Sequence, residues 1–296
     1  MKRAMIIINP TSGKEEAIHY TDQATNLLKA EGYYVTIKET QKEFDATLFC
    51  EEACNEEYDL LVSAGGDGTL HETINGMLNS THRPTLAVIP LGTVNDFARA
   101  LHIPLNPEKA IQTLSSKHTR KADIGKINDS LFINVVAAGK LAESLSEVPS
   151  ESKSKLGFFA YLKEGIKTLS GQAASPMKVT YDEDSWEGDA ILFVAALTNS
   201  VGGFEQLAPG AKIDDGFLHC YVIKDLNWFN TAVVGTSLLA GNLENSRHVH
   251  AFKAKNIYVE STEEVTTNID GESGLCLPIQ ISLLPSHISV LIPEEE

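Results

Sequence analysis

A glycine-containing stretch in the first third of the chain carries side chains suited to binding phosphate. The stretch AGGDGTLHE follows the apolar run DLLVS directly, and its three glycines can adopt positive φ and let an anion approach the backbone. Thr69 and Glu72 have the spacing of a capping box, which predicts a helix whose free N–H groups face the same point. Together these features predict an anion site, although an ordinary tight turn would use similar residues.

Two further loops of this kind follow predicted strands. The stretch VIPLGTVNDFAR places Thr93 at the end of a strand, with Asn95 and Asp96 in the first turn of a short helix. The stretch NPTSGK is not a Walker A loop, because Glu15 stands where that motif has serine or threonine. Its Lys14 is either a phosphate partner or a solvated helix residue. Three such loops on one sheet edge would bind an extended polyphosphate and its nucleoside.

Two acidic turns lie in the second half of the chain. The stretch TTNIDGESG brings Asp270 and Glu272 together across a glycine, and neighbouring carboxylates raise one another's pKa, which suits a general base acting on an alcohol. The stretch AKIDDGFL offers Asp214 and Asp215, whose oxygens could hold a hard cation. Each stretch also fits an ordinary polar turn, so the spacing leaves both alternatives open.

The composition narrows the classes of function. The 296 residues are 43% hydrophobic, as in folded globular proteins, and the formal net charge of −16 argues against general binding to nucleic acid. No apolar run approaches the roughly 20 residues of a membrane span, and the N-terminus lacks a signal-peptide pattern, so we expect a cytoplasmic protein. The four cysteines are expected to be buried or half-buried thiols, and the histidines of RHVH to be surface residues.

Strand and helix signals alternate through the first 125 residues, which predicts a mainly parallel sheet whose ligands lie beyond the carboxyl ends of the strands. A capping box at Ser12 and Glu15 predicts a helix running to Gly32. After about residue 126 turns separate the strands, which predicts an antiparallel β domain with one charged helical insert at 152–169. The expected strands are 4–9, 33–40, 58–64, 85–90, 129–139, 177–197, 216–223, 256–262 and 281–292, and further helices are expected at 44–56 and 69–79.

Taken in order, the motifs resemble those of the bacterial soluble diacylglycerol kinases, within the wider diacylglycerol and sphingosine lipid-kinase family. The resemblance covers nearly all 296 residues and rests on NPTSGK, GGDGTLHE, PLGTVNDFARAL, KADIGK, LTNSVGGFE, AKIDDGFL and NIDGE. GGDGT alone is shared with NAD kinases, whereas P-x-G-T-x-N-D-F-A-R followed by D-D-G and D-G-E is specific to the lipid-kinase branch.

The resemblance implies two domains and a reaction. It implies an α/β Rossmann-like nucleotide-binding domain of the NAD kinase and diacylglycerol kinase type at 1–126, on which the segment 284–296 packs back. It implies an antiparallel β-sandwich at 127–283 as the lipid-substrate domain. The implied activity is transfer of the γ-phosphate of ATP, the co-substrate, to a lipid hydroxyl, with diacylglycerol giving phosphatidic acid and Mg²⁺ as cofactor.

Site residues are carried over motif by motif. The DGE glutamate, Glu272, would accept the hydroxyl proton, with Asp270 beside it. Asp67, Asp96 and Asp123 would organise magnesium around the triphosphate. Nucleotide contacts would come from Asn9, Pro10, Thr11, Ser12, Gly13, Thr40, Gly66, Asp67, Gly68, Thr69, Leu70, His71, Glu72 and Thr93.

The resemblance also implies a structural magnesium site, and the sequence departs from the family pattern at one position. The DDG loop would bind the metal through the Asp215 carboxylate and the backbone carbonyls of Lys212 and Phe217. His71 stands where the family generally has asparagine in GGDGTxNE. An imidazole replaces one amide hydrogen bond but not the donor and acceptor pair, so we expect altered nucleotide affinity or altered pH dependence of binding.

Several alternatives for substrate and partners stay open. A sphingoid base or phosphatidylglycerol also presents a suitable hydroxyl, an NAD kinase would share the GGDGT logic, and a regulator could bind nucleotide without turnover. The charged segment 152–169 is either an interfacial helix that attaches reversibly to the inner face of the membrane or a helix that packs on the core. A homodimer is a further expectation.

Overall fold

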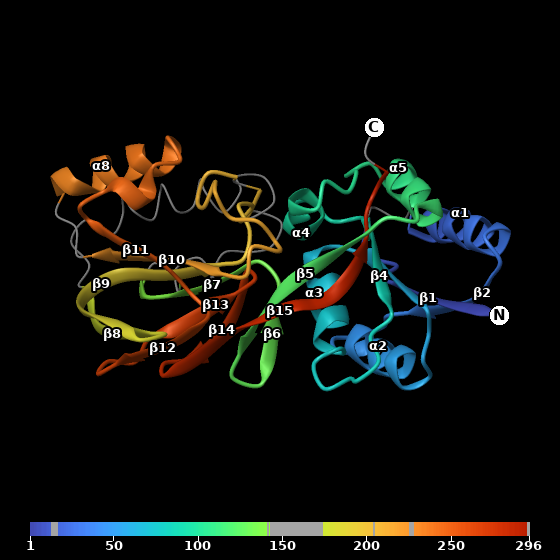
Figure 1. Ribbon diagram of the computed structural model, residues 1–296, viewed down its shortest axis with the longest axis horizontal. Coiled ribbons are helices and arrows are strands. Elements are labelled where there is room, and N and C mark those ends of the chain that lie inside the picture. Colours follow the sequence, from blue (N-terminus) through green and yellow to red (C-terminus); the bar gives the residue numbers. More distant parts are fainter. Residues whose placement is uncertain (13–16, 141, 143–173, 204, 225–227, 295–296) are drawn as a thin grey trace. The chain divides into compact units, whose positions relative to one another are not determined.

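A computed structural model describes residues 1–12, 17–140, 142, 174–203, 205–224 and 228–294 (Figure 1). The chain divides into two compact units, the first made of Met1–Ile124 with Pro285–Glu296 and the second of Gly125–Leu284. It passes from the first unit to the second within β5 and returns within β15. The predicted insert at 152–169 and the capping-box residue Glu15 lie outside the described residues.

The first unit alternates strands and helices, as predicted. Its strands follow the order β15-β4-β3-β1-β2, and β1 to β4 are parallel to one another. The end of β15 joins this sheet through a parallel pairing of Val290 with Leu86. The elements are β1 (Lys2–Ile8), α1 (Ala17–Ala30), β2 (Tyr33–Glu39), α2 (Asp45–Asn55), β3 (Leu60–Gly65), α3 (Asp67–Asn75), β4 (Thr85–Pro90), α4 (Asp96–Ala100), α5 (Pro107–Gln112), a 3₁₀ turn (Thr113–Ser115) and β5 (Thr119–Ile127).

Helices cover both faces of this sheet. Helices α1 and α5 lie on one face, and α2 and α3 lie on the other (Figure 1). The central strands are therefore buried on both sides, and each consists of an almost continuous apolar run. This explains why their positions could be predicted from the sequence, and the parallel pairing brings their carboxyl ends to one edge of the sheet.

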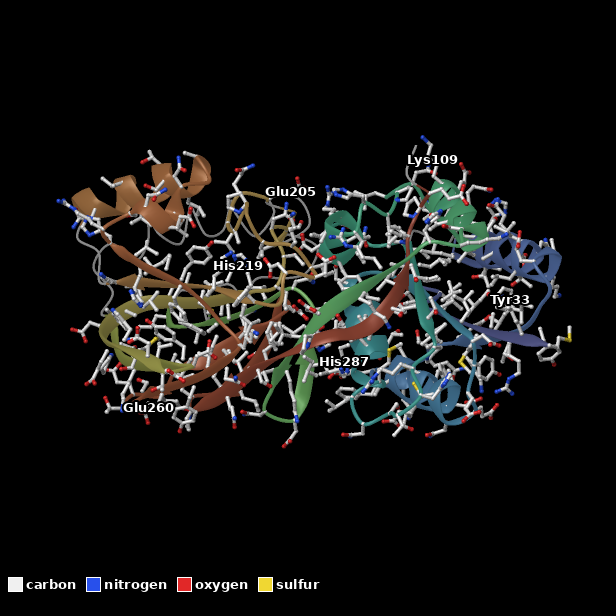
Figure 2. The ribbon with its side chains drawn as sticks, viewed as in Figure 1. Tyr33, Lys109, Glu205, His219, Glu260 and His287 are labelled. Atoms are coloured by element: carbon white, nitrogen blue, oxygen red, sulfur yellow. The ribbon has the colours of Figure 1, made fainter. Side chains whose placement is uncertain are left out.

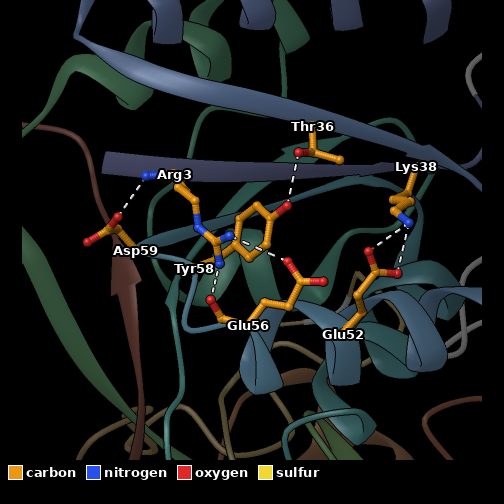
Figure 3. A network of polar contacts seen from close by, with 7 residues as sticks. All are labelled: Arg3, Thr36, Lys38, Glu52, Glu56, Tyr58 and Asp59. Carbon is orange, nitrogen blue, oxygen red and sulfur yellow. Dashed lines mark hydrogen bonds and ion pairs between the residues drawn. The ribbon is translucent and has the colours of Figure 1, made fainter. Parts of the chain in front are cut away.

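A polar network fastens the amino-terminal side of the sheet (Figure 3). The Arg3 guanidinium lies 4.2 Å from the ring centroid of Tyr58, and its side chain also contacts Glu56. The Tyr58 hydroxyl contacts the Thr36 hydroxyl at 2.9 Å, and the Arg3 N–H donates to the Asp59 carboxylate at 2.7 Å. These residues join β1, β2 and the end of α2 at the amino-terminal side of the sheet. The predicted phosphate-binding loops lie at the opposite, carboxyl ends of the strands.

The second unit is an antiparallel β-sandwich, as predicted. Strand β9 spans thirteen residues and links two groups of strands, since its first half pairs with β8 and its second half with β7 and β10. The elements are β6 (Ser130–Phe132), β7 (Val135–Ala138), β8 (Ser175–Tyr181), β9 (Asp184–Ala196), β10 (Leu218–Lys224), α8 (Trp228–Leu239), a 3₁₀ turn (Leu243–Asn245), β11 (Val249–Ala254), β12 (Asn256–Ser261), β13 (Thr266–Ile269), β14 (Glu272–Cys276) and β15 (Ile279–Leu291).

Alternate residues of β9 pack into two different cores. Phe193 lies in the core between the sheets, together with side chains of β8, β12 and β15. Leu192 and Val194 face the other way and lie in a second core with Val234 and Leu238 of α8. The sequence analysis did not predict this helix, which is labelled in Figure 1. Apolar side chains therefore cover both faces of this sheet. The loops at the ends of its strands remain as the polar surfaces of the unit.

The structure confirms part of what was expected of the cysteines and of the RHVH histidines and corrects the rest. Cys50, Cys54 and Cys220 are buried free thiols, as expected, but Cys276 is exposed. His250 of the RHVH stretch is half-buried in β11, where its Nε2 lies 2.9 Å from the Tyr181 hydroxyl and burial lowers its pKa. The expectation of a surface residue is therefore wrong for His250. Within the described residues, no helix combines the length and the apolar character required to cross a bilayer.

Candidate functional site

The carboxyl ends of the four parallel strands bring the predicted phosphate loops to one edge of the first unit. The Thr40 N–H donates to the Ile8 carbonyl at 2.9 Å, and the Asn9 N–H donates to the Ala64 carbonyl at 3.1 Å. The Leu91 N–H donates to the last residue of β3 at 2.8 Å. The loops after β2, β1, β3 and β4 therefore follow one another along the edge where open α/β sheets bind ligands.

Asn9 organises the loop after β1. Its Oδ1 accepts the N–H of Thr11 at 3.0 Å and the Thr11 hydroxyl at 2.8 Å, and its carbonyl accepts the Ser12 N–H at 3.1 Å. Its Nδ2 lies 3.4 Å from the Thr69 hydroxyl and so connects this loop to α3. Gly13 lies outside the described residues.

None of the glycines of GGDGT has a positive φ, which corrects the expectation from sequence, and Gly66 instead leaves space for a neighbouring loop. Gly65 lies in β3, Gly66 is extended with φ −89°, and Gly68 lies within α3. A Cβ on Gly66 would lie 3.3 Å from the Cα of Gly92, and a Cβ on Gly92 would lie 2.7 Å from the Cα of Gly66. The loops after β3 and β4 thus meet backbone against backbone, which a side chain at Gly92 would prevent.

The predicted capping box at Thr69 and Glu72 is wrong. Helix α3 begins earlier, at Asp67, and its first i to i−4 hydrogen bond already ends on the carbonyl of Gly66. The Glu72 carboxylate instead accepts the N–H of Ala46, at the start of α2, at 3.3 Å. The side chain that the pattern assigned to a cap therefore ties the loop after β2 to α3.

Asp67 joins the loop after β3 to the loop after β4. Its two oxygens accept the N–H groups of Asn95 at 2.8 Å and Asp96 at 3.0 Å. Asn95 has φ 55°, a conformation that asparagine adopts more readily than most residues, and its Nδ2 donates to the Gly92 carbonyl at 2.8 Å. The sequence analysis placed Asn95 at the first turn of a short helix but gave it no role in the site, and the structure puts it directly before α4.

The other two aspartates of the expected magnesium network also belong to the first unit. Asp96 is 6% exposed at the start of α4, and Asp123 is 3% exposed in β5. An oxygen of Asp123 accepts the Ser286 N–H at 2.7 Å. The structure therefore brings Asp67 and Asp96 into contact and holds Asp123 against the returning segment of the chain.

The remaining candidates for nucleotide contact differ in exposure. Thr93 is exposed and His71 is half-buried, so both side chains face or border solvent. Leu70 is only 4% exposed and packs into the unit. A bound nucleotide could therefore meet the side chains of Thr93 and His71, but only the main chain of Leu70.

In the second unit, Asp270 and Gly271 form the two-residue turn between β13 and β14. Their φ values of 49° and 97° fit a type I′ hairpin turn, in which Asp-Gly is a preferred pair. The Asp270 carboxylate accepts three N–H groups, those of Ile133 at 2.8 Å, Asn134 at 2.8 Å and Val135 at 2.9 Å. Asp270 and Glu272 are separated only by Gly271, but their carboxylates lie in different surroundings, since Glu272 is exposed at the start of β14.

The DDG loop is organised around Asp215. Its carboxylate accepts the N–H groups of Lys212 at 3.2 Å and Phe217 at 3.1 Å, and Gly216 between them has φ 78°. The Nε2 of His219, a residue labelled in Figure 2, lies 2.7 Å from the same carboxylate. Among the described residues no group of three or more histidine, cysteine or acidic side chains forms a metal site, so a cation here would need main-chain oxygens.

Two known domain families match the chain, and the boundary between the two matches lies near the boundary between the two compact units. Residues 3–127 match the diacylglycerol kinase catalytic domain, and residues 134–292 match the YegS C-terminal NAD kinase beta sandwich-like domain. The chain is 43% identical over 296 residues to a diacylglycerol kinase of Staphylococcus epidermidis, with 99% of this chain and 93% of that protein covered. It is 42% identical to a diacylglycerol kinase of Staphylococcus aureus over the same shares.

Two solved structures from Bacillus anthracis resemble the chain over 99% of its length. One, assigned provisionally as a diacylglycerol kinase, has a TM-score of 0.87 at 32% identity and is 95% covered. Another, a diacylglycerol kinase, has a TM-score of 0.76 at 29% identity and is 97% covered. The fold, the order of the motifs and these relatives agree that the chain belongs to the diacylglycerol kinase family of ATP-dependent lipid kinases, which are phosphotransferases with an alcohol as acceptor.

Proposed function

We propose that this chain transfers the γ-phosphate of ATP to the hydroxyl of diacylglycerol and releases phosphatidic acid. The family supports the reaction class, and its relatives carry the name of this activity. The observation that carries the proposal is the edge of four joined loops in the first unit, where Gly66 and Gly92 meet backbone to backbone. A strand-to-helix turn with no side chain at Gly66 or Gly68 suits an extended polyphosphate.

The nucleotide would lie along this edge. We assign its contacts to the loop at Asn9, to Thr40, to the turn at Gly66 and to Thr93. Asp67, Asp96 and Asp123 fit magnesium in their chemistry, because carboxylate oxygens are its preferred ligands and one carboxylate can accept N–H groups and still face a cation. Bound Mg²⁺ would neutralise charge on the transferring phosphate.

Glu272 would accept the proton of the attacking hydroxyl. It is exposed and ionisable, as a base for an external alcohol must be, and it follows a turn that three hydrogen bonds to Asp270 hold in place. Asp270 therefore acts in this proposal as a positioning residue. The hydrogen bonds fix the backbone from which Glu272 projects.

The DDG loop would hold a second, structural magnesium. Its ligands would be the Asp215 carboxylate and the main-chain carbonyls of Lys212 and Phe217, which are oxygen donors of the kind a hard cation takes. The N–H contacts and the His219 contact already fix the orientation of the Asp215 carboxylate. Such a preformed loop loses little freedom when it binds a cation.

Diacylglycerol resides in a bilayer, so the enzyme would meet its substrate by reversible association with the cytoplasmic face of the membrane. The segment 152–169, for which an interfacial helix is one of the two alternatives, carries four lysines among aromatic residues. Basic residues near an anionic surface contribute about 1 kcal/mol each, which suits reversible attachment.

The proposal is tested by replacing the base. Wild type and Glu272→Ala are incubated with Mg²⁺ and γ-labelled ATP on mixed micelles containing diacylglycerol. The expected loss of phosphatidic acid formation in the variant is roughly 10²- to 10⁴-fold, with an unchanged circular dichroism spectrum. Glu183→Ala, which changes another exposed glutamate of the second unit, is the matched control. Near wild-type turnover by Glu272→Ala would remove Glu272 from the mechanism.

A further inference from the structure

Phe44 is an exposed aromatic side chain in a conformation that aromatic residues rarely adopt. It lies directly before α2, has φ 68° and ψ 2°, and exposes 60% of its surface. A residue with a Cβ is strained at such angles, where glycine is not. Burial of the ring does not compensate for this strain, because most of the ring faces solvent. The position therefore suggests a role for the ring outside the folded core.

The loop that carries Phe44 is fastened at both ends to the nucleotide edge. At one end the Thr40 N–H donates to the Ile8 carbonyl at the end of β1. At the other end the Ala46 N–H donates to Glu72, at 3.3 Å, in the last position of GGDGTLHE. Between them the Asp45 carboxylate accepts two loop N–H groups at 2.8 and 3.0 Å, which fixes the turn. The main chain that carries Phe44 is thus tied to the loops proposed to bind ATP.

The order of the strands gives the bound nucleotide a direction. The loops after β4 and β3 carry Asp96 and Asp67, where a magnesium-bound triphosphate belongs. The loop with Phe44 follows β2, which is the outermost strand at the other end of the sheet. A nucleotide with its phosphates at the carboxylates would therefore extend its base toward Phe44.

We infer that Phe44 stacks on the nucleobase of the bound nucleotide and raises affinity for it. Every base has a flat π face, so an exposed aromatic ring at the base end of the site stacks on it without requiring specific hydrogen bonds. The inference rests on the proposed function for the place of the triphosphate. It assigns Phe44 to binding and not to the chemical step.

The test measures ADP binding without lipid, so that it does not depend on the identity of the acceptor. Phe44→Gly removes the ring and relieves the backbone strain. We expect its Kd for ADP to rise about tenfold or more while its melting temperature rises. Leu48→Ala is the matched control, because Leu48 is 55% exposed one helical turn further along α2. Its affinity for ADP should equal that of the wild type.

A second variant reports the contact directly. Phe44→Trp should bind ADP with near wild-type affinity, and its added emission, relative to wild type, should be quenched by ADP but not by inorganic tripolyphosphate. Wild-type affinity in Phe44→Gly, a lowered melting temperature in that variant, or quenching by tripolyphosphate would each overturn the inference. If the wild type bound ADP but phosphorylated no lipid, the proposed function would fail and the assignment of Phe44 would stand.

Discussion

Asp270 and Glu272 are separated by one glycine, yet their contacts predict opposite results when each carboxylate becomes an amide. In Asp270→Asn, one of two acceptor oxygens becomes an NH₂ group that faces an N–H donor of residues 133–135. An unpaired donor costs about 1–3 kcal/mol, and the remaining hydrogen bonds lose the help of the negative charge. Because the side chain is half-buried and water meets part of the loss, we expect a destabilisation of about 2–4 kcal/mol.

Glu272→Gln should behave in the opposite way. The side chain is exposed, and no hydrogen bond or ion pair of it is found within the part of the chain that the structure describes. The free energy of unfolding should stay within about 0.5 kcal/mol of the wild type. Turnover should nevertheless fall by roughly 10²- to 10⁴-fold, because glutamine cannot accept the proton.

Urea unfolding followed by tryptophan emission measures the difference. Both tryptophans of the chain, Trp186 and Trp228, belong to the second unit, so their emission reports on the unit that contains the turn. Asp270→Asn should lower the midpoint with an unchanged slope, whereas Glu272→Gln should leave both unchanged. Equal stability of Asp270→Asn and the wild type would refute the assigned role of the three hydrogen bonds.

Two more predictions concern the first unit. Asp67→Asn removes one of the acceptors that hold Asn95 and Asp96, so we expect a loss of about 1–3 kcal/mol and a higher Mg²⁺ concentration for half-maximal activity; an unchanged magnesium titration would contradict this. His287, labelled in Figure 2, has its pKa lowered from 6.5 to about 4 by burial and by Arg83. The folded state keeps this imidazole neutral, whereas the unfolded chain takes up the proton first as the pH falls. The contribution of the neutral imidazole to the free energy of unfolding is therefore complete above pH 6.5 and is lost as the pH falls toward 4. With a discount for partial exposure we expect about 1–2 kcal/mol, and chemical denaturation of His287→Leu should show a smaller loss of stability over this range; an unchanged pH profile would contradict the assignment.

The sequence predicted the elements whose burial pattern is simple. Strands β1, β3 and β4 are almost continuous apolar runs because helices cover both faces of the sheet, and the helices between them required parallel crossovers. The strands of the second unit likewise predicted an antiparallel β domain, and the family resemblance implied that this domain is a sandwich. Helix α8 was missed because its sequence, WFNTAVVGTSLL, is apolar almost all round and shows no polar face that marks a surface helix.

The contacts of the site could not be predicted, because they depend on main-chain groups far apart in the sequence. Asp270 binds N–H groups about 135 positions away, and no local pattern distinguishes such an anchor from an ordinary turn residue. Glu72 matched a capping pattern but bonds to α2, since α3 begins at Asp67. The motifs identified candidate residues of the site, whereas the structural role of each residue depends on its tertiary contacts.

The identity of the phosphorylated product shows directly which acceptor this kinase uses. Wild-type protein with Mg²⁺ and γ-labelled ATP is offered diacylglycerol, sphingosine, phosphatidylglycerol and NAD in parallel, and the labelled product is identified by chromatography and mass spectrometry. We expect label in phosphatidic acid, formed from diacylglycerol in an amount well above the products of the other acceptors. Label in NADP, or in a lipid other than phosphatidic acid, would contradict it.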